Sequence, residues 1–251
     1  MKPPGPRWRG SLFPLRYWNQ VPPLAVQAAL RAVFPQWGLP DRIRVDNGPP
    51  WGSSSDLPPA LALWWIGLGI GVIWNRPYHA QANGFVERFH GLLDAWGEPA
   101  ACADHQAWAT QVAWVVATQR ERYPAIAGRS RLAAFPALQV PRRAYTPAQE
   151  PAEWDLGRVY AHLAAERWPR WVNQSGQITL YRRVYSVGRA WAGRQVWVRF
   201  APQDATWVID SEDGRALARH PAGELTAERI RALAVSHVRA SERRPLVRTT
   251  S

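Results

Sequence analysis

Apolar and polar residues in the first half of the chain recur with periods that predict a mixture of helices and strands. An apolar stripe at helical spacing covers residues 22–36 and stops before Gly38-Leu39-Pro40. Residues 41–46 alternate between polar and apolar, which predicts a strand. Helical spacing returns over residues 81–96 and again over residues 104–122.

A long apolar run lies between these elements. Residues 57–74 carry no charge, so the run is just long enough for a membrane span. Prolines near its start and glycines near its end favour a different interpretation. We expect a buried helix over residues 56–67 and a buried strand over residues 71–75, with a membrane-associated protein as the alternative.

The second half of the chain predicts a linker and then a small all-β domain. Residues 133–151 are rich in proline and alanine, and residues 223–251 form an arginine-rich tail that we expect to be a helix with a frayed basic end. Between them, short alternating runs separated by glycines predict a small antiparallel barrel or sandwich. The runs cover residues 178–182, 184–187, 195–200 and 206–209.

The charge of the chain points to a polyanionic partner. It has 31 Lys and Arg against 19 Asp and Glu, a net charge of +12, and an isoelectric point near 11.0. Arginines that neutralise phosphates release counterions and give sequence-independent affinity for DNA, although a solvated basic surface would have the same composition. The candidate phosphate contacts in the second half are Arg182, Arg183, Arg189, Arg194 and Arg199.

Cysteine content and the first residues bear on the compartment. Cys102 is the only cysteine, so no intrachain disulfide or cysteine-based zinc site can form, which fits a reducing cytoplasm. The proline-rich start lacks the apolar segment of a signal peptide. We therefore expect a cytoplasmic protein that is not held in a membrane.

Two motifs carry a resemblance to a known family. Val45-Asp46-Asn47-Gly48-Pro49 closes the predicted strand, and the second motif covers residues 77–90 and contains Asn83-Gly84-Phe85-Val86-Glu87-Arg88. Their order and setting resemble the second and third acidic motifs of DDE transposases and integrases of the insertion-sequence type. The resemblance implies an α/β RNase H-like core followed by a small all-β barrel of the SH3-like or Mu-transposase-like kind.

The same resemblance implies a chemistry. Asp46 and Glu87 would be catalytic carboxylates that bind two Mg²⁺ or Mn²⁺ ions for strand transfer on DNA, and Gln81, Asn83 and Arg88 would face the DNA end. The family's first carboxylate, on an upstream strand, has no counterpart, because no Asp or Glu precedes Asp41. Asp41 cannot replace it, since an odd separation from Asp46 on one strand turns the two side chains to opposite faces.

The predicted helix at the second motif separates a core side from a chemical side. Phe85, Phe89, Leu92 and Trp96 share one face at spacings of four, three and four residues, and we expect them to be buried. Glu87 lies on the opposite face.

We therefore interpret the chain as a DDE transposase or integrase whose N-terminal strands are missing, and we expect it to lack strand-transfer activity. DNA at element ends and targets would be its partner, in a homo-oligomer or in mixed assembly with a full-length transposase. The alternative is a non-catalytic DNA-binding remnant or a modulator of such a transposase. The expected parts are a core remnant over 1–135, a linker over 136–170, a barrel over 171–222 and a basic helix or tail over 223–251.

Overall fold

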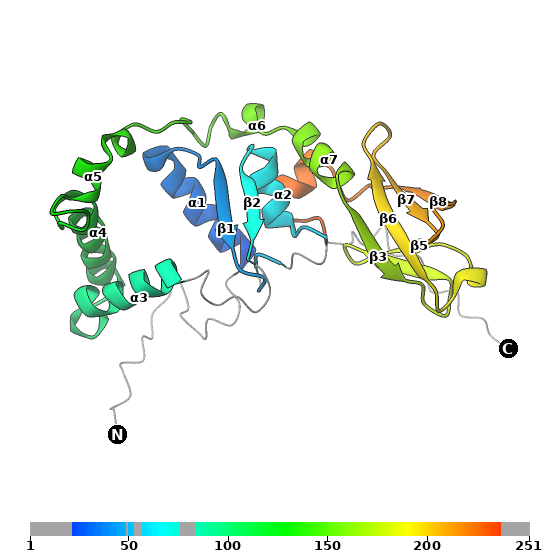
Figure 1. The fold of residues 1–251 in the computed structure, drawn as a ribbon, viewed down its shortest axis with the longest axis horizontal. Coiled ribbons are helices and arrows are strands. Elements are labelled where there is room, and N and C mark those ends of the chain that lie inside the picture. The colour runs from blue at the N-terminus through cyan, green and yellow to red at the C-terminus, as the bar shows by residue number, and fades with distance from the viewer. Residues whose placement is uncertain (1–21, 49, 53–56, 76–83, 237–251) are drawn as a thin grey trace, which may run out of the picture.

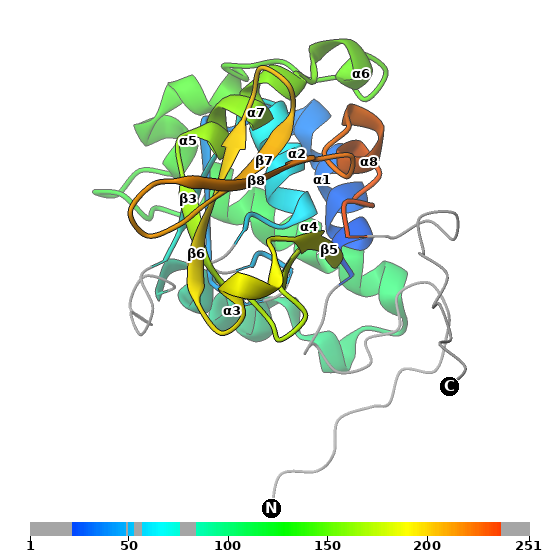
Figure 2. The same cartoon turned by 90° about the vertical axis from the view of Figure 1, so that its right-hand side faces the viewer.

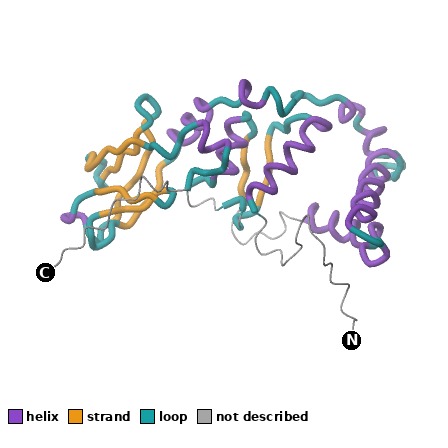
Figure 3. Tube along the Cα trace, turned by 180° about the vertical axis from the view of Figure 1, so that it is seen from behind, coloured by secondary structure: helices purple, strands orange, loops and turns teal. Residues whose placement is uncertain are grey.

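The computed structural model describes residues 22–48, 50–52, 57–75 and 84–236. Helices and strands are mixed, and they lie in three parts along the long axis of the molecule (Figure 1). A helical arm stands at one end, a unit of two parallel strands with helices lies in the middle, and antiparallel strands occupy the other end. Figure 3 shows the same order from behind.

The middle part is a βαβ unit preceded by a helix. Strands β1 and β2 pair in parallel, with Arg42 opposite Gly71 and Val45 opposite Trp74. Helix α2 connects them, as parallel strands require a crossover. These elements confirm the helices and strands expected from the sequence over residues 22–75. Their bounds are α1 (Pro23–Trp37), β1 (Arg42–Val45), α2 (Ala60–Gly67) and β2 (Gly71–Trp74).

Helix α2 is the centre of the fold. Seven of its eight residues are buried, and a helix that is apolar all round must be covered on every side. Helix α7 (Leu156–Ala164), helix α8 (Ala227–Arg231) and β2 all pack against it, and Figure 2 shows α8 beside α1 and α2. Within the described residues, no helix is long and apolar enough to cross a membrane.

The segment that the sequence presents as a linker holds the C-terminal end of α2. The Arg143 guanidinium donates to the carbonyls of Leu68 and Gly69, the latter at 3.0 Å, and Arg158 Nη1 donates to Gly67 O at 3.0 Å. These carbonyls have no partner inside a helix, so arginines near them satisfy and stabilise its end. Six residues of the segment are buried: Tyr145, Glu150, Trp154, Val159, Leu163 and Trp168.

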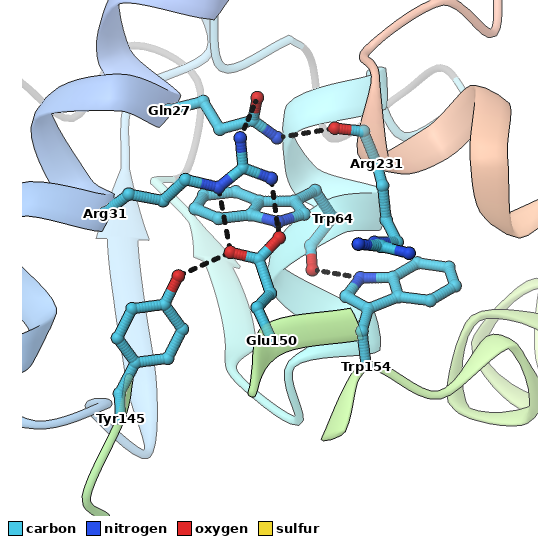
Figure 4. Close-up of polar contacts among 7 residues, drawn as sticks. All are labelled: Gln27, Arg31, Trp64, Tyr145, Glu150, Trp154 and Arg231. Atoms are coloured by element: carbon cyan, nitrogen blue, oxygen red, sulfur yellow. Dashed lines mark hydrogen bonds and ion pairs between the residues drawn. The ribbon is translucent and has the colours of Figure 1, made fainter. Parts of the chain in front are cut away.

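A carboxylate buried in this segment joins it to the first two helices (Figure 4). Glu150 is 2% exposed and lies at the start of α6 (Glu150–Glu153). Arg31 of α1 donates to it from Nε at 2.8 Å and from Nη2 at 2.5 Å, Trp64 Nε1 of α2 donates at 3.0 Å, and the Tyr145 hydroxyl also donates. A buried charge needs this degree of pairing to be tolerated.

The same contacts shift two pKa values. Burial alone would raise the pKa of Glu150, but hydrogen bonds from Arg31, Tyr145 and Trp64 outweigh it and hold that pKa below its ordinary value of 4.5. Burial first, and then the hydrogen bond to Glu150, raises the pKa of Tyr145 far above its ordinary value. Glu150 is therefore ionised, and Tyr145 remains its donor, at neutral pH.

The antiparallel part is an open sheet plus a hairpin. Four strands pair in the order β3-β6-β7-β8, and β4 and β5 form a separate two-stranded sheet. Tyr181 and Arg182, both with positive φ, connect β4 to β5, as in the two-residue turns that fit hairpin twist. The bounds are β3 (Arg167–Trp171), β4 (Gln177–Leu180), β5 (Arg183–Ser186), β6 (Gln195–Ala201), β7 (Thr206–Asp210) and β8 (Ala216–Pro221), with a 3-10 turn, η4 (Arg189–Trp191), before β6.

The expected antiparallel all-β pairing is confirmed, but the strands of the described residues form no closed barrel. Instead of closing, the sheet uses its inner face to pack against the rest of the molecule. Tyr160 of α7 contacts Phe200 of β6, with ring centroids 4.9 Å apart, and the Tyr181 hydroxyl donates to Pro58 O at 2.8 Å. One continuous cluster of buried apolar residues extends from Phe34 to Val235. The sheet and the βαβ unit thus share a core.

The helical arm packs mainly on itself. Trp96 of α3 contacts Tyr123 and Trp114, with ring centroids 5.4 and 6.5 Å away. The expected burial of Phe89 is wrong, because Phe89 is 38% exposed; α3 packs against α4 rather than on a sheet. Leu92 and Trp96 are half-buried. The arm comprises α3 (Gly84–Gly97), η2 (Pro99–Ala101), α4 (His105–Glu121), α5 (Arg131–Ala134) and η3 (Pro136–Gln139).

Replacing Glu150 with glutamine should destabilise the protein by about 3 kcal/mol at pH 7, because the buried arginine contact loses its charge. Since the folded pKa of Glu150 is depressed, its stabilisation is present above about pH 4.5 and is lost as the pH falls further. Urea unfolding of both proteins from pH 7 to pH 3 should show the difference shrinking toward acid. A difference independent of pH would contradict the charged contact.

Replacing Gly67 with alanine should destabilise the core by about 1 to 3 kcal/mol through overpacking. A Cβ there would lie 2.1 Å from Cε2 of Trp154, whose indole donates to Trp64 O at 3.0 Å. Gly91 in α3 is the matched control, because a Cβ at Gly91 meets nothing within 4 Å. Thermal unfolding should show a lower Tm for Gly67→Ala only; equal Tm values for the two variants would refute the packing of Trp154 on α2.

Candidate nucleic-acid interface

Asp46 lies at the carboxyl end of the parallel strands. It directly follows β1 and is exposed, and its Oδ1 accepts from Gly48 N at 3.0 Å. Asn47 Nδ2 donates to Asn75 O at 2.8 Å, and Asn75 N donates to Val45 O at 2.9 Å. These bonds tie the ends of β1 and β2 together. The carboxylate emerges at the edge where open α/β sheets bind ligands.

Glu87 lies in the first turn of α3 and is exposed, as is Arg88. Figure 1 shows α3 as part of the helical arm, away from the ends of β1 and β2. Among the described residues, no three His, Cys, Asp or Glu side chains gather in a group that could hold a metal ion. The donor set seen there does not fit a two-metal site. Gln81 and Asn83 lie outside the described residues.

The outer face of the four-stranded sheet gathers positive charge. Arg167 of β3 is opposite Arg199 of β6, Arg199 is opposite Val208 of β7, and Val208 is opposite Arg219 of β8. Opposed residues on paired strands point to the same face, so the three arginines form one row across the sheet. Val208 is fully buried although it is not part of the apolar core cluster. The alkyl chains of the neighbouring arginines can cover it on the outer face.

Aromatic and acidic groups hold this row in place. The Arg167 guanidinium lies 4.7 Å from the ring centroid of Trp197, a cation–π distance. Arg199 Nε donates to Asp210 Oδ2 at 2.7 Å, and Arg219 Nη2 donates to Asp204 Oδ2 at 2.8 Å. All three arginines are exposed. We name this set the arginine face: Arg167, Trp197, Arg199, Val208 and Arg219.

The arginines expected to contact DNA divide between surface and core. Arg182, Arg189, Arg194 and Arg199 are exposed. Arg183 is different, because its Nε lies 3.6 Å from the carboxylate of Glu224, which is fully buried. Tyr185 and Trp207 donate hydrogen bonds to that carboxylate, each at 2.7 Å. Arg183 thus supports the sheet from within.

Sequence reasoning missed two members of the arginine face. Arg167 falls within the predicted linker, and Arg219 lies on β8, a strand that the sequence pattern does not predict. The alternation of polar and apolar residues over residues 216–221 is weak, and Pro169 argues against a strand at that position. Pro169 is tolerated because β3 is an edge strand. No family model matches the chain.

Proposed function

We propose that this protein binds duplex DNA through the arginine face. The observation that carries the proposal is the cross-strand row of Arg167, Arg199 and Arg219 on the open face of the sheet. Strands are about 4.8 Å apart, so the row from β3 to β8 spans about 14 Å. That span is close to the roughly 12 Å width of the DNA major groove, so its outer arginines can reach phosphates on both sides.

The ion pairs of the row are compatible with this role. Arg219 and Asp204 are both about half exposed, at 53% and 51%. Exposed pairs of this kind contribute little to stability, so Arg219 can exchange its carboxylate for a phosphate at small cost. Asp210 is 13% exposed and Arg199 is 46% exposed. The more buried carboxylate therefore orients Arg199 without withdrawing it from solvent.

We further propose descent from a DDE-type transposase or integrase core, with DNA integration as the ancestral reaction. Its support is the order α1, β1, α2, β2, α3 with parallel strands, Asp46 directly after β1, and Glu87 in α3, the helix that follows β2. Mg²⁺ or Mn²⁺ would be the ancestral cofactor. Since no three His, Cys, Asp or Glu side chains among the described residues gather in a group that could hold a metal ion, DNA binding without strand transfer is the function that this geometry supports best.

Removing Arg167 and Arg219 together should weaken duplex binding and lower the salt slope of the affinity by about two, because each phosphate contact contributes about 0.9. Fluorescence anisotropy from 50 to 200 mM salt measures both quantities. The matched control replaces Arg122 and Arg129, two exposed arginines of the arm, and should change the slope little. Equal losses in both double variants would show that net charge, not the arginine face, determines binding.

The purified chain should give neither 3′-end cleavage nor strand transfer with Mg²⁺ or Mn²⁺. The reason is that Asp46 and Glu87 alone cannot hold two metal ions in the positions that in-line attack on a phosphodiester requires. Gel analysis of labelled DNA ends is the measurement. Products that disappear in both Asp46→Ala and Glu87→Gln would overturn this expectation, whereas a contaminating nuclease would be insensitive to these changes.

A further inference from the structure

An open hollow continues the arginine face at the end of β3. It has a volume of about 720 Å³, and Trp171 and Gln195, which are opposed in the β3–β6 ladder, contribute to its wall. The turn between β7 and β8 closes the other side. The lining residues are Trp171, Trp191, Arg194, Gln195, Ser211, Glu212 and Asp213.

The hollow combines open aromatic surface with a stacked guanidinium. Trp171 is 69% exposed, a high value for a large apolar side chain. The guanidinium of Arg194 lies 5.5 Å from the ring centroid of Trp191. Indole rings and guanidinium planes are the surfaces on which unpaired nucleobases stack.

Carboxylates on the β7–β8 turn add a polar edge. Ser211 is buried, and its hydroxyl donates to Asp213 and accepts from Arg215 N at 3.1 Å. These bonds fix Asp213 in the turn, while Glu212 beside it is exposed. A carboxylate accepts hydrogen bonds from exocyclic amines such as N4 of cytosine.

We propose that this hollow binds an unpaired nucleobase of DNA that carries an exocyclic amine, stacked on Trp171 with its amine toward Glu212 and Asp213. The inference rests on the proposed DNA binding and adds a preference for duplexes with a single-stranded end. A phosphate fits the hollow poorly because two carboxylates line it. A cationic side chain would have to share the hollow with Arg194, whose guanidinium lies 5.5 Å from the ring centroid of Trp191.

The test compares three labelled duplexes with the full-length protein: one blunt, one with an overhang of four dC and one with four dT. Fluorescence anisotropy at one salt concentration should show that the dC overhang binds about tenfold more tightly than the blunt duplex, a gain in the range of one stacked base. Thymine lacks an exocyclic amine, so the dT overhang should gain less.

Three variants localise the effect. Trp171→Ala should abolish the gain from the overhang and leave blunt-duplex affinity unchanged, whereas Asp213→Asn should reduce the preference for dC over dT. Trp37→Ala is the matched control, since Trp37 is also partly exposed, at 39%, and has an arginine, Arg120, 4.1 Å from its ring centroid. It should retain the full gain.

The outcomes separate this inference from the proposed function. Equal affinity for blunt and overhanging duplexes would overturn the nucleobase site and leave duplex binding intact. A gain that survives Trp171→Ala would likewise overturn it. Failure to bind any of the three duplexes would refute the proposed function itself.

Discussion

The buried carboxylate of Glu150 is the contact on which the rest of the arrangement depends. It draws donors from Arg31, Trp64 and Tyr145, and a charge at this depth is tolerated only with such partners. Once Glu150 is fixed, the following turn lays Trp154 on α2, where its indole donates to Trp64 O, and α7 then leads into the sheet. Glu224 repeats the device inside the sheet with Arg183, Tyr185 and Trp207. Each buried glutamate thus contacts an arginine, a tyrosine and a tryptophan. Together, Glu150 and Glu224 stabilise the single continuous core.

This shared core decides which surface of the sheet is available to a partner. Phe200, Trp207 and Ile209 turn inward and belong to the core cluster, so the inner face is occupied by α7 and its neighbours. Residues that alternate with them along the strands must point outward. The arginine face lies on this outer side of the sheet. The segment over residues 136–170 packs against the inner face of the sheet, so the sheet is not an independent unit. Its outer face, which carries arginines and Trp197, therefore remains exposed.

The sequence predicted the local elements better than their partners. The helix before Gly38-Leu39-Pro40, the strand ending at Asp46 and the buried helix α2 all follow from periodicity and from prolines and glycines at their ends. The face of α3 that carries Phe89 could be identified, but its burial depends on a packing surface that spacing does not reveal. Likewise, nothing local distinguishes Arg182, at a hairpin turn, from Arg183, beside a buried glutamate. Arg31 and Glu150 are 119 positions apart, and such pairing is invisible to local patterns.

Hydrogen–deuterium exchange of the full chain, measured by mass spectrometry with and without duplex DNA, tests the central claim most directly. If the arginine face binds DNA, exchange should slow in peptides that cover β3, β6 and β8, and peptides from α1 and α2 should exchange at unchanged rates. Protection confined to the residues around Asp46 and to α3, with none in the sheet, would contradict the account and assign DNA binding to the acidic end of the parallel strands.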